Sequence, residues 1–256
     1  MDLHLKGRTV LVAGSSRGIG KGIATLLLGE GCRVCITGRD ADQLEVTRNS
    51  LQAKFGCDAV LASAGDLEQP AGVKAALDTI STAWGDLDVL VVNLGSGRGQ
   101  AGWDLDAVEW ERLFSANFFG SVRLTQAAIP RMGRGGSIIM IASIVGVEAT
   151  AAPLPYSAAK AALINYGKNL SRTLAASGIR VNCIAPGNIF FTGGSWEKHL
   201  QSRPEWVSQY LSNEVPLQRF GTPEEVAALA AYLASPLAAF ATGGCYILDG
   251  GQTRTI

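Results

Sequence analysis

The sequence predicts an α/β fold in which a single doubly wound (Rossmann-type) domain covers residues 1–256, with about seven parallel strands and helices on both faces. Three observations support this prediction. Short runs of β-branched and other apolar residues alternate with longer helical stretches, which is typical of successive βαβ units. The strand-like runs are apolar almost throughout, as in a parallel sheet that is buried on both faces. A glycine-rich turn directly follows the first strand, where such sheets bind ligands.

The strands and helices are expected to alternate along the whole chain, with no linker, repeat or low-complexity tract between them. Strands are expected at residues 9–13, 34–37, 59–62, 89–92, 137–142, 180–185 and 246–248. Helices are expected at 20–29, 41–54 and 108–132. A further helical stretch follows the third strand and ends at about residue 84, and another begins at about residue 156. Residues 227–241 are expected to form a buried helix and its exit.

The composition indicates a globular protein with no strong overall charge. The 22 basic residues balance the 22 acidic ones, so no global field would attract nucleic acid or an anionic membrane. The first residues lack the long apolar stretch of a signal peptide, and residues 227–241 are too short to span a bilayer. We therefore expect a cytoplasmic protein without nucleic-acid or membrane partners.

The five cysteines show no spacing typical of disulfides. Cys32 and Cys35 form a C-x-x-C pair, but this pair overlaps the second expected strand, on which positions i and i+3 point to opposite faces. We interpret them as core residues rather than as a metal or redox site. No other cluster has metal-ligand spacing, so no metal is expected.

The glycine-rich turn at residues 13–20 reads AGSSRGIG and leads into a helix. Glycines allow the backbone to turn tightly and to approach a ligand closely. The amino terminus of the helix offers unpaired N–H groups and the positive end of a dipole to a pyrophosphate. This context favours a dinucleotide site over a purely structural turn.

The end of the second strand bears on the choice of cofactor. A site for NAD usually places an acidic residue here to bind the ribose 2′-hydroxyl, but Gly38 stands in that position and Arg39 follows it. Arg17 lies in the glycine-rich turn, and two guanidinium groups suit a 2′-phosphate. We therefore expect NADP(H), with NAD(H) as the alternative because Asp40 is only one residue further on.

A tyrosine and a lysine are expected on one face of a helix. Tyr156 and Lys160 stand at positions i and i+4, which places their Cβ atoms about 5–6 Å apart. A neighbouring ammonium lowers the pKa of a phenol from its usual value of about 10, and Ser143 precedes the pair at the end of a strand. Each residue alone has an ordinary structural explanation. Tyr156 could be an aromatic residue that caps the helix, Lys160 a solvated lysine and Ser143 the end of a strand. Asn117, in an earlier helix, could make a local hydrogen bond. Their joint spacing with the glycine-rich turn favours catalysis.

Together these motifs resemble the short-chain dehydrogenase/reductase family. The matching segments span nearly the whole chain: residues 13–20, Asp66, Asn93-Leu94-Gly95, Asn117, Ser143, Tyr156-Ser157-Ala158-Ala159-Lys160, Pro186-Gly187 and Leu248-Asp249-Gly250-Gly251. The resemblance implies that Tyr156 exchanges a proton with the substrate oxygen, that Ser143 holds this oxygen, and that Lys160 binds the nicotinamide ribose and lowers the pKa of the tyrosine. It also implies that Asn117 helps to hold a water molecule in a proton relay.

The resemblance implies a cofactor site as well. Asp66 is expected to contact the adenine ring and Asn93 to support the floor of the site. The expected cofactor-binding residues are Gly14, Ser16, Arg17, Gly18, Ile19, Gly20, Arg39, Asp66, Leu67, Asn93, Gly95, Tyr156, Lys160, Pro186, Gly187 and Ile189. Members of the family are often tetramers, so a homotetramer is expected, with a homodimer as the smaller alternative.

The chain departs from the family pattern at three places. Ala13 replaces a threonine before the first glycine, which is expected to matter little. Leu94 replaces an alanine, which is expected to crowd the cofactor or shift the turn. Phe191 stands where a threonine often contacts the carboxamide, and Thr192 follows one residue later, so either the loop bulges or that contact is lost.

Residues 188–215 show no clear periodicity and are rich in aromatic side chains, so we interpret them as a lid over an apolar substrate pocket. Subunit contact or ordinary core is the alternative for these side chains.

The expected activity is NADP(H)-dependent hydride transfer to a carbonyl, similar to that of 3-oxoacyl thioester reductases. An NAD-dependent dehydrogenase of a polyol, sugar or cyclic alcohol is the second hypothesis, and a cofactor-sensing binding protein without catalysis is the third.

Overall fold

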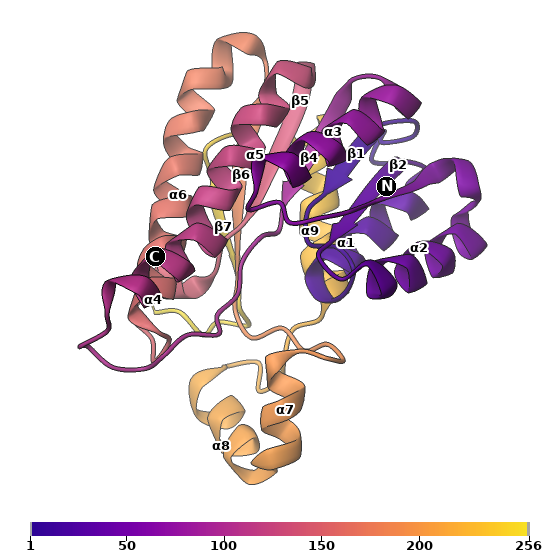
Figure 1. The fold of residues 1–256 in the computed structure, drawn as a ribbon. Helices are drawn as coiled ribbons and strands as arrows, with labels where there is room; N and C mark the ends of the chain where they lie inside the picture. Colours follow the sequence, from indigo (N-terminus) through magenta and orange to yellow (C-terminus); the bar gives the residue numbers. More distant parts are fainter. Residues whose placement is uncertain (1, 255–256) are drawn as a thin grey trace.

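The computed structural model describes residues 2–254, and a seven-stranded parallel sheet forms its centre (Figure 1). The strand order is β3-β2-β1-β4-β5-β6-β7, and every pair of neighbours is parallel. The order reverses between β1 and β4, which places a crevice beyond the carboxyl ends of these strands. The predicted doubly wound fold is confirmed. The strands are β1 (Thr9–Val12), β2 (Arg33–Gly38), β3 (Val60–Ala64), β4 (Leu87–Val92), β5 (Met132–Ile141), β6 (Arg180–Pro186) and β7 (Cys245–Leu248).

Helices cover both faces of the sheet, and alternate strand residues pack against each layer. Val10 and Val12 belong to the core under α1 (Gly18–Gly29), α2 (Ala41–Phe55) and α9 (Pro223–Ala234). Leu11 and Leu90 belong to the core under α3 (Pro70–Trp84), α5 (Gly120–Ala128) and α6 (Leu154–Leu174). Burial of both strand faces explains why the strands read as apolar runs.

The helix expected at 108–132 is confirmed over residues 107–131, but its hydrogen-bond pattern changes along its length. Helix α4 (Ala107–Phe114) leads into a π-helical turn (Ser115–Phe119), then α5, and a 3-10 turn (Ile129–Arg131) that contains Pro130. Strand β5 then begins at Met132, earlier than expected, with a register shift against β4. The π-helical turn contains Asn117, and such turns are frequent at functional sites.

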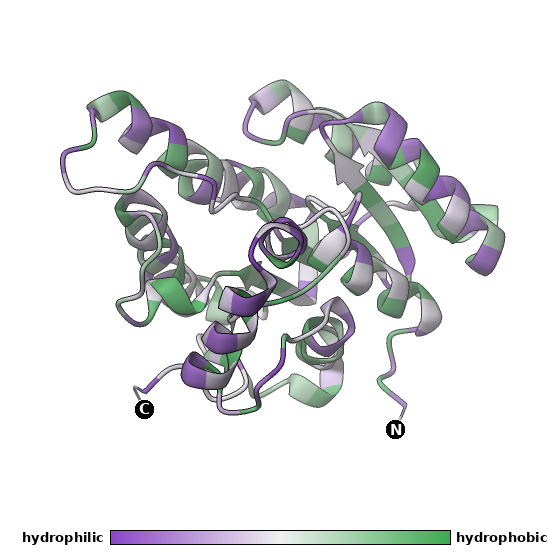
Figure 2. Cartoon of the chain, turned by 90° about the horizontal axis from the view of Figure 1, so that it is seen from below, coloured by the Kyte–Doolittle hydropathy of each residue, from purple (hydrophilic) through white to green (hydrophobic). Residues whose placement is uncertain are grey.

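The segment expected to lack regular structure, 188–215, contains two short helices, α7 (Ser195–Ser202) and α8 (Pro204–Glu214). They project below the carboxyl edge of the sheet (Figure 1), and Figure 2 views them from below, with hydrophilic and hydrophobic residues interspersed along them. A helix of two or three turns is too short to show a clear period, and ring contacts hold these two together. Trp196 lies 5.2 Å from Tyr210 and 5.0 Å from Phe220 between ring centroids, and stacks on Trp206 at 6.3 Å.

Within residues 2–254, no helix combines the length and the apolar character that crossing a bilayer requires.

Candidate active site

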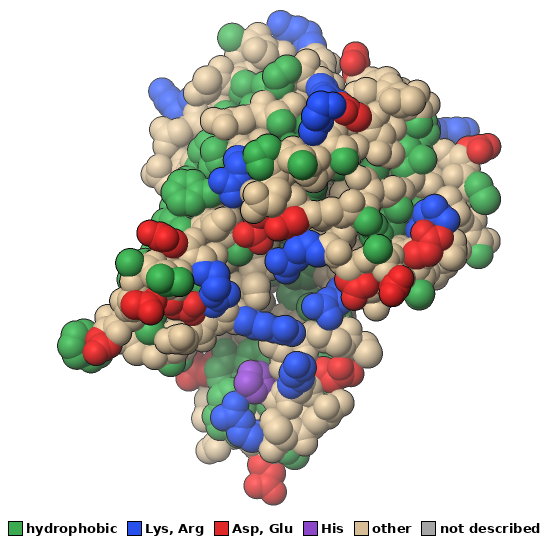
Figure 3. All heavy atoms as spheres, in the orientation of Figure 1, with side chains coloured by type: hydrophobic (Ala, Val, Ile, Leu, Met, Phe, Trp, Pro, Cys, Tyr) green, Lys and Arg blue, Asp and Glu red, His purple; other side chains and the backbone are tan. Residues whose placement is uncertain are grey.

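The predicted site residues gather at one cleft, between the carboxyl edge of the sheet and the α7–α8 segment. Figure 3 shows this hollow with Lys and Arg side chains along its rim. The residues of the expected site that line the cleft are Gly14, Ser16, Arg17, Gly18, Ile19, Arg39, Asp66, Leu67, Asn93, Gly95, Ser143, Tyr156, Lys160, Gly187 and Ile189. Three others, Gly20, Asn117 and Pro186, are buried instead of lining it.

The glycine-rich turn fits a pyrophosphate because side chains are excluded from it. A Cβ on Gly14, where φ is +60°, would lie 2.4 Å from the backbone oxygen of Asn93. A Cβ on Gly20 would lie 2.3 Å from the Gly14 oxygen, so Gly20 acts beneath the turn. The Asn93 amide donates to that same oxygen at 2.9 Å and fixes the turn. The first N–H groups of α1 have no partner within the helix and are available to an anion.

The end of β2 is arranged around Gly38. A Cβ there would lie 3.1 Å from the Ser16 Cβ, so the close approach of the turn favours glycine. The Asp40 carboxylate accepts the Gln43 N–H at 3.0 Å and caps α2. The exposed Arg39 guanidinium lies 3.5 Å from the Glu68 carboxylate, a surface ion pair of the kind that contributes little to stability. Arg39 is therefore free to exchange this partner for a phosphate.

The Asn117 side-chain amide makes three hydrogen bonds to the backbone. Its oxygen accepts the Ser96 N–H at 3.0 Å, and its nitrogen donates to the backbone oxygens of Ser96 at 3.1 Å and Leu113 at 3.0 Å. A Cβ on Gly95 would lie 2.2 Å from that amide oxygen. The local bond to Leu113 agrees with the structural explanation, but the bonds to Ser96 tie the loop after β4 to the helix. Both N–H donors of the amide are occupied, so only its oxygen has a lone pair left for the implied water contact.

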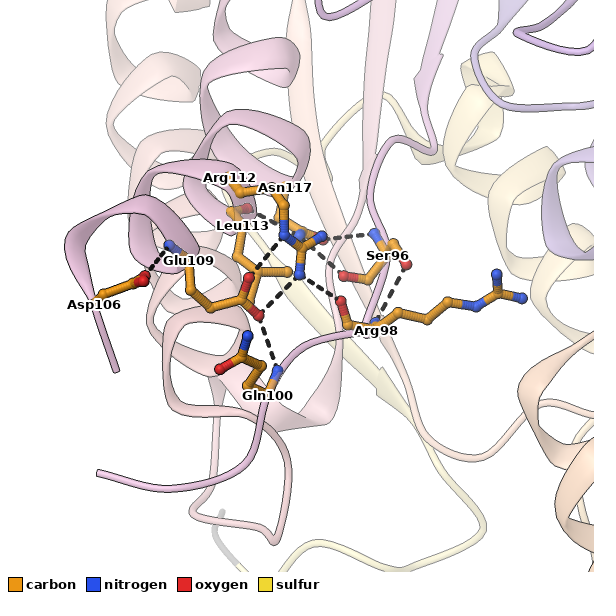
Figure 4. A network of polar contacts seen from close by, with 8 residues as sticks. All are labelled: Ser96, Arg98, Gln100, Asp106, Glu109, Arg112, Leu113 and Asn117. Atoms are coloured by element: carbon orange, nitrogen blue, oxygen red, sulfur yellow. Dashed lines mark hydrogen bonds and ion pairs between the residues drawn. The ribbon is translucent and has the colours of Figure 1, made fainter. Parts of the chain in front are cut away.

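A charged clamp continues this network along the loop (Figure 4). Glu109 accepts two hydrogen bonds from Arg112, both at 2.8 Å, and one from the Gln100 N–H at 2.9 Å. Arg112 also donates to the Arg98 oxygen at 2.9 Å. Hydrogen bonding by Arg112 lowers the pKa of Glu109, so the Glu109 carboxylate and the Arg112 guanidinium are both charged near neutral pH. The loop is therefore fixed by its backbone, and Gly97 within it passes close to the ring of Tyr156.

Lys160 is buried, which excludes the solvated-lysine alternative. Its ammonium donates to the backbone oxygens of Leu94 at 3.1 Å and Ile141 at 3.0 Å, at the ends of β4 and β5. Burial lowers the pKa of Lys160 to about 8. An ammonium has three donors, so one remains for the cleft.

Tyr156 and Ser143 face each other across the junction of β5 and α6. Burial raises the pKa of Tyr156, and a hydrogen bond with Ser143 acts in the opposite direction. Lys160 is not among the causes of this shift, so the expected lowering of the Tyr156 pKa by Lys160 is not found. Ser143 caps the short turn Ile144–Gly146, where a Cβ on Gly146 would lie 2.6 Å from the Lys160 carbonyl carbon. This close contact sets the distance between Ser143 and α6.

The three departures from the family pattern have different outcomes. Ala13 is buried and its N–H donates to the Val91 oxygen at 2.9 Å. Leu94 supplies its carbonyl to Lys160, and its side chain packs on the sheet core. The Phe191 ring lies directly against Gly18, whereas Thr192 is exposed and outside the cleft lining. The loop therefore offers no threonine to the cleft.

The sequence analysis missed Gly97, Gly146 and Gln252, and it placed Asn188 and Tyr210 only within the expected lid segment 188–215. Gly97 and Gly146 matter only through close contacts with α6, and a single glycine gives no sequence signal for that. Asn188, Tyr210 and Gln252 line the cleft together, although they are separated by up to 64 positions. No spacing rule connects such residues.

Among residues 2–254, no group of three or more His, Cys, Asp and Glu side chains is placed to hold a metal ion.

Comparisons with known proteins give a consistent result. A family model described as enoyl-(acyl carrier protein) reductase matches residues 13–253. The 3-oxoacyl-acyl-carrier-protein reductase of Aquifex aeolicus is 32% identical over 98% of this chain and 100% of its own. The 2-(S)-hydroxypropyl-CoM dehydrogenase 3 of Xanthobacter autotrophicus is 31% identical over 99% of both chains. The crystal structure of L-sorbose reductase from Gluconobacter frateurii, complexed with NADPH and L-sorbose, covers 100% of both chains with a TM-score of 0.93 and 32% identity.

Proposed function

The chain belongs to the short-chain dehydrogenase/reductase family of oxidoreductases, and on this premise we propose that it is an NADP(H)-dependent reductase of ketones, of the 3-oxoacyl or a related carbonyl type. One observation carries the proposal: Ser143, Tyr156 and a buried Lys160 meet at the cleft that also contains the glycine-rich turn. A protein that only binds a dinucleotide has no use for this arrangement.

The bound nicotinamide supplies the hydride. The chain supplies a proton and a polar environment. The Tyr156 hydroxyl donates its proton to the substrate oxygen, and the Ser143 hydroxyl donates a hydrogen bond to the same oxygen as negative charge develops. Lys160, anchored by two carbonyls, keeps a positive charge near the phenol below about pH 8 and favours the phenolate that remains. Its third N–H would hold the nicotinamide ribose.

The preference for NADP(H) rests on the residues at the end of β2. Arg39 and Arg17 line the cleft, and Gly38 leaves room between them. Asp40, the residue that kept NAD(H) as an alternative, is engaged in capping α2. The similarity to a reductase whose structure contains NADPH supports the same preference.

The decisive experiment measures kcat/KM with NADPH and NADH over a panel of 3-oxoacyl thioesters, cyclic ketones and ketoses. We expect turnover with NADPH on at least one class. In Arg39→Ser, the preference for NADPH over NADH is expected to fall by about 10- to 100-fold, because a charge-assisted hydrogen bond is worth about 1.5–3 kcal/mol. Arg48→Ser, in α2 but outside the cleft lining, is the control. Equal use of both cofactors by the unmodified chain would contradict the proposed preference.

A second substrate class, the polyols and sugars, is favoured by one specific feature. Asn188, Tyr210 and Gln252 form a polar network in the lining of the cleft, which also contains Trp196 and Trp206. An apolar acyl chain makes no use of such groups.

We also propose that the chain forms a homotetramer. Large apolar side chains are exposed late in the chain: Phe240 is fully exposed, and Tyr232, Leu237 and, on the edge strand β7, Ile247 are exposed in part. Exposed apolar patches of this kind mark association surfaces. Light scattering on the purified chain tests this proposal, and a monomer would contradict it.

A further inference from the structure

Three residues from separate segments meet in the lining of the cleft that also contains Ser143, Tyr156 and Lys160. Asn188 directly follows Gly187 after β6, Tyr210 lies in α8, and Gln252 follows β7. The Asn188 amide nitrogen donates to the Tyr210 hydroxyl oxygen at 3.1 Å and to the Gln252 amide oxygen at 2.7 Å. The Gln252 amide nitrogen donates to the same hydroxyl oxygen at 2.9 Å. We call these three residues the amide–phenol triad.

Several donors and acceptors of the triad are unused, among them the second N–H of Gln252, the Tyr210 O–H and the Asn188 amide oxygen. A phenol oxygen accepts two hydrogen bonds through its lone pairs and donates one through its O–H. Both lone pairs of Tyr210 are occupied by amide nitrogens, so its O–H has to point elsewhere, and no residue among 2–254 accepts it. The Asn188 amide oxygen likewise has no hydrogen-bond donor within the described chain and is not sealed from solvent.

The backbone holds the triad in place. The Asp249 carboxylate accepts the N–H groups of Gly251 at 2.9 Å and Thr253 at 2.7 Å, which curls the chain around Gln252. A Cβ on Gly187 would lie 2.7 Å from the Asp249 Cβ, so this curl is in close contact with the loop that carries Asn188. The Tyr210 ring is held by Trp196 and stacks on Trp206. The unused O–H is therefore presented at a fixed place.

We propose that the amide–phenol triad binds a hydroxyl group of the substrate, so that the preferred substrate is a neutral hydroxyketone. This inference rests on the proposed reductase function. A hydroxyl group accepts one hydrogen bond and donates another, which matches the unused Tyr210 O–H and the unused Asn188 oxygen. A carboxylate only accepts, so the Asn188 oxygen would repel it.

The test compares three ketones that differ in one group: 2-hexanone, its monohydroxy derivatives and the corresponding methyl ethers. The ratio of kcat/KM between hydroxyketone and plain ketone is measured in each variant with NADPH, so that the intrinsic reactivity of each carbonyl cancels between variants. The methyl ether accepts a hydrogen bond from Tyr210 but donates none to Asn188. It is expected to fall between the other two.

Two variants remove the Tyr210 O–H from the cleft in different ways. Tyr210→Phe deletes the hydroxyl, and Tyr166→Phe, in α6 and outside the cleft lining, is its control. Gln252→Glu keeps the size and shape of the side chain but replaces the amide nitrogen by an oxygen, which would accept the Tyr210 O–H and turn it away from the cleft. A merely structural role of the triad predicts little change in selectivity in this second variant, because the three side chains remain hydrogen-bonded.

We expect the hydroxyketone preference to fall about five- to tenfold in both variants, the usual effect of one neutral hydrogen bond, with unchanged affinity for NADPH. A preference that persists in Gln252→Glu overturns the inference, even if Tyr210→Phe fails to fold. Reduction of plain and hydroxylated ketones at equal rates by the unmodified chain also overturns it, while leaving the proposed reductase function intact. Failure to reduce any ketone overturns both.

Discussion

The two walls of the cleft are built from different kinds of contact. On the sheet side, the side chains of Asn93, Asn117 and Lys160 bind backbone atoms of Gly14, Ser96, Leu94 and Ile141. On the α7–α8 side, aromatic rings contact other rings, and the amide–phenol triad joins side chain to side chain. Backbone anchors fix a position for any substrate, whereas contacts between side chains change with each substitution. The first wall suits chemistry and the second suits substrate choice.

The largest expected effect is a loss of turnover without a loss of cofactor affinity, caused by a substitution on the sheet side of the cleft. Tyr156→Phe removes the proton donor but no side chain that anchors the backbone, so turnover is expected to fall roughly 100- to 10,000-fold. Affinity for NADPH, measured by fluorescence titration, is expected to stay within about twofold. Tyr166→Phe on the same helix, whose ring contacts Phe118, is the control. A parallel loss of cofactor affinity would show that the phenol also has a structural role and would blur the comparison.

The next effect concerns the free energy of unfolding, which is lowered by burying the charged Lys160 on the sheet side of the cleft. The pKa of Lys160 falls from 10.5 to about 8 on folding, because burial disfavours the ammonium. Below about pH 8 both states carry the proton and the folded state bears the full cost, about 3 kcal/mol. Between pH 8 and 10.5 the unfolded chain binds more protons, so this residue makes stability rise with pH, by about 1 kcal/mol from pH 8 to pH 9.

Urea unfolding of the wild-type chain and Lys160→Met at several pH values measures this contribution as the difference between the two. The difference is needed because burial raises the pKa of Cys32, Cys35 and Cys183 to about 12, which makes stability fall as the pH rises above about 9. Both chains share that fall. If the free energies of unfolding of the two proteins changed with pH in parallel, the lowered pKa of Lys160 would be contradicted.

The same contrast explains how much the sequence predicts. The sheet, the glycine-rich turn and the Tyr156–Lys160 pair follow from periodicity and local spacing, because each depends on contacts within one element or between an element and the backbone. The hydrogen bonds between the Asn117 amide and Ser96 were not predictable, since they join a helix to a loop that is 21 positions away. Nor was the triad, because Asn188 and Gln252 are brought together only by the pairing of β6 with β7.

The smallest expected effect on global stability tests the second wall. Trp196 contacts the rings of Trp206, Tyr210, Phe220 and His199, and Trp196→Leu removes four aromatic pairs that are worth about 0.5–1.5 kcal/mol each. If the α7–α8 segment opens separately from the body, meaning the sheet and the helices that cover it, Trp196→Leu changes the free energy of global unfolding by less than about 1 kcal/mol. Amide hydrogen exchange at 195–214 is then expected to quicken at least about tenfold, while exchange in β4 and β5 stays unchanged.

The control for this measurement is a substitution of similar severity in the body. Leu124→Ala empties a buried position under the sheet and is expected to cost about 2–5 kcal/mol of global stability. Faster exchange throughout the sheet in Trp196→Leu would mean that the aromatic contacts are part of one cooperative unit with the body. The two walls would then differ in composition but not in rigidity, and substrate choice could not be assigned to a separately mobile segment.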